Sequence, residues 1–61
     1  MLTFDNIDAI TAAVTATPGL NLTDKHAVAD QVYARIIALG FSSEFANDEA
    51  ADIALDIVEA N

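Results

Sequence analysis

Two helix-breaking signals divide this chain into three segments, and they restrict its fold more than any other feature. Pro18-Gly19 marks a turn, because proline disfavours helical geometry in the residue before it. Gly40 is placed to end a helix in the left-handed conformation, which glycine adopts at little cost. Within the segments, apolar residues recur every three or four positions, which is the period of an amphipathic helix. The sequence therefore predicts an all-α fold, a small three-helix bundle with helices at about 4–16, 24–39 and 43–59.

The start of each predicted helix carries a capping residue. Thr3 and Thr23 are the expected N-caps of the first two helices, since a hydroxyl oxygen accepts from the free amides of a first turn. Ser42 or Ser43 can cap the third helix, although a later start at Asn47-Asp48-Glu49, after a short turn, is the alternative. The stripes expected to face the core are Phe4, Ile7, Ile10 and Val14 in the first helix, and Val28, Val32, Ile36 and Leu39 in the second. The second stripe is widened by Ala29, Tyr33 and Ile37.

The chain is one small domain with little core to bury. A fold of 61 residues buries only about 60% of its unfolded surface, so its stability is marginal. Cysteine is absent, which excludes disulfides and cysteine-based zinc sites. Domains of this size then rely on good helix packing or on self-association. We expect a single acidic helical domain at 1–61, with a homodimer as one way to complete its core.

The charge of the chain is strongly one-sided. The chain has ten acidic residues and two basic ones, Lys25 and Arg35, so its formal net charge is −8. Phosphate binding needs lysine and arginine, so direct binding to nucleic acid or to an anionic membrane is not expected. An acidic chain is attracted instead to basic protein surfaces. Two simpler explanations stay open: the acidity keeps a small apolar protein in solution, or the host is adapted to salt.

No segment of the sequence is typical of targeting or membrane insertion. The first residues include no basic region before an apolar run, so they do not resemble a secretory signal. No apolar stretch approaches the ~18 residues of a membrane span. A cytoplasmic protein is therefore expected.

The acids concentrate in the third predicted helix. Asp48, Asp52 and Asp56 repeat every four residues, so a helix carries them on one side. Like charges at this spacing repel by about 0.2–0.5 kcal/mol per pair. Either the fold tolerates this loss of stability or the function of the protein uses the charges. We predict a partner-binding acidic stripe, made of Glu44, Asp48, Glu49, Asp52, Asp56 and Glu59.

Apolar residues occupy more of the third helix than one partner requires. A single core-facing stripe needs an arc only slightly above ~100°, whereas the alanines, isoleucines, Leu55 and Val58 of this segment spread over most of its circumference. We therefore expect this helix to touch both the other two helices and a second protein surface, such as another copy of the chain. The candidate apolar interface residues are Tyr33, Phe41, Phe45, Leu55 and Val58, and the alternative for the aromatic ones is a place at the edge of the core.

The residues needed for catalysis or metal binding are missing from the sequence. His26 is the only histidine, and no nucleophile or orienting acid can be named beside it. The chain has no Asp-x-Asp-x-Asp-Gly loop for calcium and no Glu-x-x-His pair for a di-iron site. We expect no catalytic residue, no bound metal and no cofactor.

Two functions fit this reading. The first is a non-enzymatic protein–protein interaction or assembly module that self-associates through apolar helix faces. The alternative is an acidic inhibitor or regulator that docks its C-terminal carboxylate stripe on the basic surface of a nucleic-acid-binding protein, as a viral nucleic-acid mimic would. The oligomeric state separates the two, because only the first requires a dimer.

Overall fold

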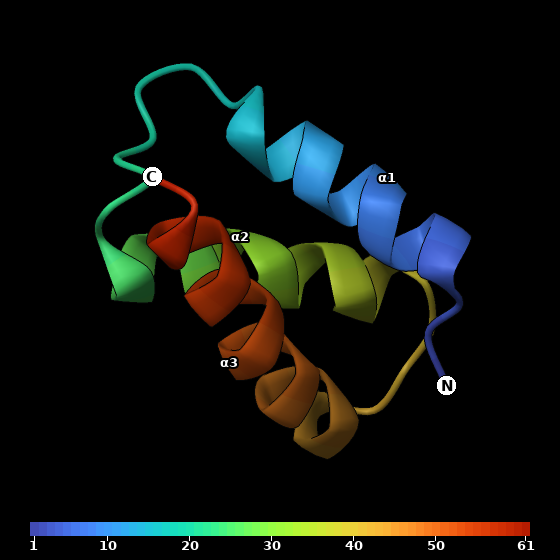
Figure 1. Cartoon of the computed structure of the whole chain (residues 1–61). Coiled ribbons are helices and arrows are strands. Elements are labelled where there is room, and N and C mark those ends of the chain that lie inside the picture. The colour runs from blue at the N-terminus through green and yellow to red at the C-terminus, as the bar shows by residue number, and fades with distance from the viewer.

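The computed structural model describes all 61 residues and contains three α-helices joined by two short connections (Figure 1). They are α1 (Phe4–Thr15), α2 (Lys25–Ala38) and α3 (Ser43–Glu59). α2 runs back beneath α1, and α3 crosses α2 so that its C-terminus returns toward the α1–α2 connection (Figure 1). The predicted all-α three-helix bundle is confirmed. The predicted start of α1 and both ends of α3 are correct, whereas the end of α1 and both ends of α2 are displaced by one residue.

The start of α1 is closed by two reciprocal hydrogen bonds. Thr3 is the N-cap, and its hydroxyl oxygen accepts from the Asn6 amide at 3.0 Å. The Asn6 side-chain oxygen accepts in turn from the Thr3 amide at 3.2 Å. Two amides that no helical carbonyl can reach are thereby satisfied, so the predicted cap is confirmed.

α2 is capped by Asp24, and the prediction of Thr23 as its N-cap was wrong. One Asp24 carboxylate oxygen accepts from the amides of His26 and Ala27, at 3.1 and 3.3 Å. The Thr23 hydroxyl and amide are already bound to the side-chain oxygen of Asn21, at 2.7 and 3.0 Å. Thr23 therefore belongs to the turn before the helix, and the carboxylate that follows it takes the capping position.

α3 is continuous from Ser43, so the alternative start at Asn47 is wrong. The hydroxyl oxygen of Ser42 accepts from the Phe45 amide at 3.2 Å, which caps the helix one turn earlier. Gly40 precedes this cap with φ at +95°, the left-handed conformation predicted for it. Gly40 thus follows the end of α2 and Ser42 caps the start of α3, so only four residues separate the two helices.

The core lies between the three helices and is small. α2 and α3 form the main interface, and α1 packs on both with fewer contacts. Three of the five buried α3 residues are alanines, and such small side chains allow helices to approach closely. The buried residues are Leu2, Ile10, Val14, Val28, Val32, Ile36, Ala46, Ala50, Ile53, Ala54 and Ile57.

Two residues predicted to face the core lie at the surface instead. Phe4 is 88% exposed, because it lies six residues before Ile10 and hence about 120° away from it around α1. Leu2, just before the N-cap, is buried in its place. Leu39 is 50% exposed, because it follows the last turn of α2 as its C-cap.

None of the three helices is both long enough and apolar enough to cross a bilayer.

Candidate functional site

The six acidic residues predicted as a binding stripe all lie on α3. Five of the six are exposed, and Glu49 is half-buried. The buried residues of α3 occupy the opposite side of the helix, so the carboxylates point away from the core. The five exposed residues are Glu44, Asp48, Asp52, Asp56 and Glu59.

Two members of the stripe border α1 rather than facing only solvent. Glu49 lines a surface hollow together with Thr3 and Phe4, at the N-terminus of α1. Unpaired amides give this end of a helix a partial positive charge, so a carboxylate there is favourable. Asp56 lines a second hollow, between α3 and α1. Glu49 thus lies beside the start of α1, a position that the sequence pattern did not reveal.

The charge of the stripe is not neutralised within the chain. None of the side-chain hydrogen bonds involves a carboxylate of α3. The two bases, Lys25 and Arg35, both belong to α2. The outer face of α3 is therefore an exposed anionic surface, available to a cationic partner or screened by salt.

The five predicted interface residues divide into two groups. Phe41 and Phe45 stack with ring centroids 4.8 Å apart, and both are half-buried against the core. Tyr33 and Val58 are likewise half-buried and packed on it. Leu55 differs, because 41% of its surface is exposed.

Leu55 lies within the acidic stripe. It follows Asp52 by three residues and precedes Glu59 by four, so both acids are its neighbours on the helix surface. The outer face of α3 is therefore not purely anionic, because it presents one large apolar side chain among carboxylates.

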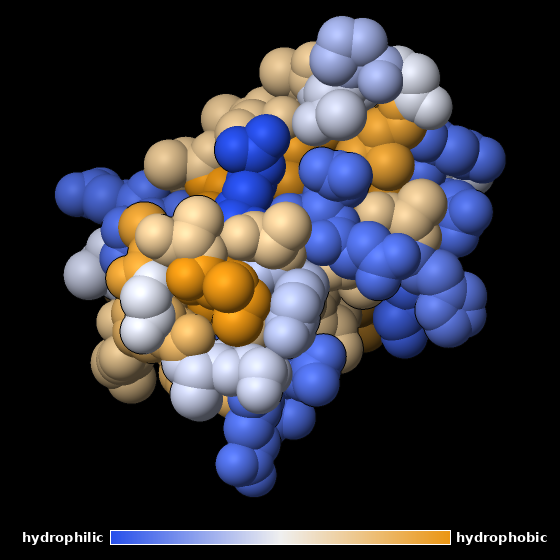
Figure 2. Space-filling model, turned by 180° about the vertical axis from the view of Figure 1, so that it is seen from behind, coloured by the Kyte–Doolittle hydropathy of each residue, from blue (hydrophilic) through white to orange (hydrophobic).

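Further apolar surface lies outside the predicted site. Met1, Phe4, Ile37 and Leu39 are exposed. From behind, apolar surface appears in separate areas with hydrophilic side chains between them (Figure 2). Ile37 was expected at the edge of the core-facing stripe of α2, but it is 36% exposed, because it lies one residue beyond the buried Ile36 and so turns away from the core. The exposure of Leu39 depends on where α2 ends, which periodicity alone does not specify.

The structure brings together no constellation of side chains suited to metal binding. No group of three or more histidine or acidic side chains is placed to hold a metal ion. His26, the single histidine, is exposed in the first turn of α2. No polar side-chain atom is buried without a hydrogen-bond partner.

Comparison of the chain with protein-family models, with curated proteins and with solved structures finds no match. The structure itself therefore defines the class of the protein, which is a small all-α three-helix bundle with an acidic outer face on α3.

Proposed function

We propose that this chain is a non-enzymatic protein–protein interaction and assembly module that self-associates through apolar helix faces. The observation that supports this role is that apolar side chains on α2 and α3 remain exposed or only partly buried. Tyr33 and Ile37 are four residues apart on α2, and Leu55 and Val58 are three apart on α3. Residues at these spacings are neighbours on a helix, so each pair makes an apolar ridge that a second chain can cover.

The size of the core also favours assembly. Eleven of the 61 residues are buried, and the largest fully buried side chains are Ile36 and three valines. A domain of this size gains little stability from such a core, and covering a further apolar face adds to it.

Charge gives self-association a recognisable salt dependence. Each copy carries a net charge of −8, and Leu55 lies between two acids. Two copies that meet near α3 repel one another until salt screens the carboxylates. The dimer should therefore tighten as salt rises, whereas a complex with a basic partner should weaken.

Sedimentation equilibrium across a wide range of protein concentrations, at low and high salt, tests this role. We expect a concentration-dependent dimer that is more populated at high salt. Leu55→Gln should weaken it several-fold, because a polar group replaces an apolar contact at the proposed interface. Leu39→Gln is the matched control, since Leu39 is exposed to a similar degree on another part of the surface.

Two results would contradict the module. One is a chain that stays monomeric at every concentration and salt. The other is equal weakening of the dimer by both leucine substitutions, while circular dichroism shows that both variants remain helical.

The unpaired carboxylates favour a second candidate function, which is an acidic inhibitor or regulator that docks on the basic surface of a nucleic-acid-binding protein. Carboxylates four residues apart rise about 6 Å along a helix, a step comparable with the phosphate spacing of a nucleic-acid strand. Asp48, Asp52 and Asp56 make two such steps on the outer face of α3. A viral nucleic-acid mimic is the sharpest form of this candidate.

Charge reversal tests the second candidate. Affinity capture from host extract should yield a nucleic-acid-binding protein that is held at low salt and released at high salt. The double variant Asp52→Lys, Asp56→Lys should not retain it, because two cations then replace two of the carboxylates. Equal retention by the variant at low salt would exclude docking through the stripe.

A further inference from the structure

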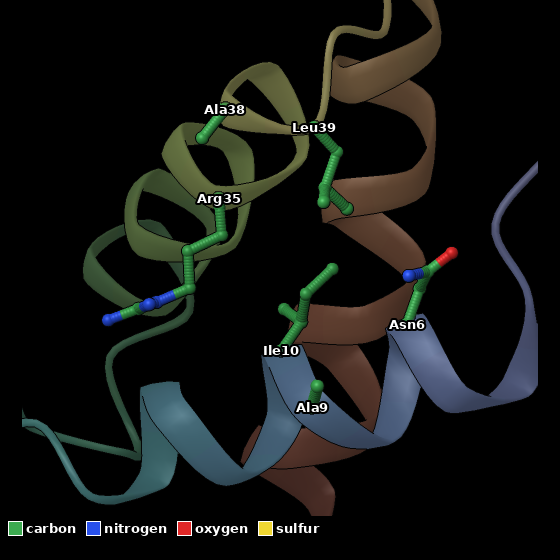
Figure 3. Close-up of a pocket in the computed structure, with 6 residues that line it drawn as sticks. All are labelled: Asn6, Ala9, Ile10, Arg35, Ala38 and Leu39. Carbon is green, nitrogen blue, oxygen red and sulfur yellow. The ribbon is translucent and has the colours of Figure 1, made fainter.

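A hollow between α1 and α2 is a feature that neither interaction surface uses. It is lined by three residues of α1, two residues of α2 and the C-cap residue that follows α2, and it has a volume of about 270 Å³. Ile10 and Leu39 point toward one another across it, whereas the side chain of Arg35 extends outward from α2, away from both, with its guanidinium at the outer side (Figure 3). The lining residues are Asn6, Ala9, Ile10, Arg35, Ala38 and Leu39.

The hollow follows from the small side chains on the facing surfaces of the two helices. Ala9 on α1 and Ala38 on α2 end at Cβ, so neither reaches across the space between the helices. Leu39, as the C-cap of α2, remains half-exposed at its edge. Four of the six lining residues are hydrophobic, so the floor of the hollow is apolar.

Two hydrogen-bond donors remain free at the rim. The Asn6 side-chain oxygen is used by the Thr3 amide, whereas its NH₂ group donates no hydrogen bond within the chain. That nitrogen lies on the side of the amide nearer the hollow (Figure 3). Arg35, at the other end, likewise makes no side-chain hydrogen bond.

Arg35 can also stabilise the last turn of α2 through its positive charge. That role requires the charge alone, and not an adjoining apolar hollow. The combination of a cation, a neutral donor and an apolar floor is the arrangement found in small-molecule sites.

We propose that this hollow binds a small amphipathic carboxylate. The carboxylate pairs with the planar guanidinium of Arg35, whose donors match its two oxygens. The apolar chain of the ligand lies against Ile10, Leu39 and the two alanines. The volume is near the lower limit of ligand pockets, about 300 Å³, so the ligand is a short-chain acid. A singly charged head is favoured over a phosphate, because the net charge of −8 repels a dianion more strongly.

The probe for this site is hexanoate, titrated into the ¹⁵N-labelled chain and followed by backbone amide shifts in NMR spectra. We expect saturable shifts that centre on the hollow. Hexanol, of similar length and without charge, should bind about fivefold more weakly, the upper limit for an exposed ion pair. Hexylammonium should bind no better than hexanol.

Substitutions test whether Arg35 is the source of the preference for hexanoate over hexanol. Arg35→Gln should make hexanoate and hexanol bind alike, while the matched control Lys25→Gln removes the same charge from α2 and should leave the preference intact. Ala38→Leu should weaken both ligands, because it fills the hollow. Circular dichroism checks that each variant remains helical. If Ala38→Leu does not fold, the comparison of Arg35→Gln with Lys25→Gln still tests whether Arg35 causes the preference for hexanoate over hexanol.

Three outcomes would overturn the proposal. They are equal binding of hexanoate and hexanol by the unsubstituted chain, shifts that centre outside the hollow, and equal effects of Arg35→Gln and Lys25→Gln. None of them bears on self-association, since Leu55 and Val58 do not line this hollow.

Discussion

Single side chains determine where the helices of this protein begin. Thr3, Asp24 and Ser42 each supply an oxygen to amides that the helix itself leaves without acceptors. At α2 the predicted cap was Thr23, whereas Asp24, one residue later, caps the helix. Asn21 decides the outcome, because its side chain engages the hydroxyl and amide of Thr23.

The capping of α2 gives the first prediction. Asp24→Ala should lower the free energy of unfolding by about 0.5–2 kcal/mol, because two first-turn amides lose their acceptor. Thr23→Ala should cost less, since its hydroxyl reaches only another side chain in an exposed turn. Urea denaturation of both variants measures the difference. A larger loss for Thr23→Ala would show that the turn, and not the cap, controls the start of α2.

At the scale of elements, α1 is the least firmly packed helix. α2 and α3 share the main interface, and each surface hollow of the molecule borders α1 or the residues just before it. Only Ile10 and Val14 of α1 are buried. Its contribution to the core therefore rests on two side chains and on Leu2.

This packing predicts unequal hydrogen exchange. The amides of α1 should exchange faster than those at the centres of α2 and α3, because fewer apolar contacts oppose the local opening of α1. Val14→Ala should accelerate exchange in α1 most, and Phe4→Ala should change it little, since Phe4 is exposed. Exchange followed by NMR provides the measurement, and equal rates in all three helices would indicate one cooperative unit.

At the scale of the whole molecule, charge opposes folding. The net charge is −8, and α3 places Glu44, Asp48, Asp52 and Asp56 at successive intervals of four residues. Each such pair repels on the folded helix, whereas the unfolded chain lets the charges separate. Screening by salt should therefore favour the folded state.

Salt should raise the melting temperature by about 5 °C between low and high ionic strength, since relief of several repelling pairs amounts to about 1 kcal/mol in a domain of this size. Asp52→Asn should show a smaller salt response, because it removes an acid that has an acidic neighbour four residues away on either side. Thermal melts at low protein concentration separate this effect from dimer formation. A melting temperature independent of salt would contradict the repulsion.

The acidic stripe could be predicted largely because it depends on local geometry. A repeat of four residues places Asp48, Asp52 and Asp56 on one side of any helix. Phe41 and Phe45 show the limit of this reasoning, since the sequence left them open between an interface and the edge of the core, and their burial depends on which surfaces the other helices cover. The hollow between α1 and α2 was not predicted at all, because it arises where two helices distant in sequence meet.

The sequence by itself determined the number of helices, their breaks at Pro18-Gly19 and Gly40 and the anionic face of α3, because these follow from backbone preference and helical period. Only the tertiary structure decided that Leu2 rather than Phe4 is buried, that Glu49 lies beside the start of α1, and that Arg35 borders an apolar hollow. The physical reason is that burial depends on the packing partner of each surface, and that partner comes from another part of the chain.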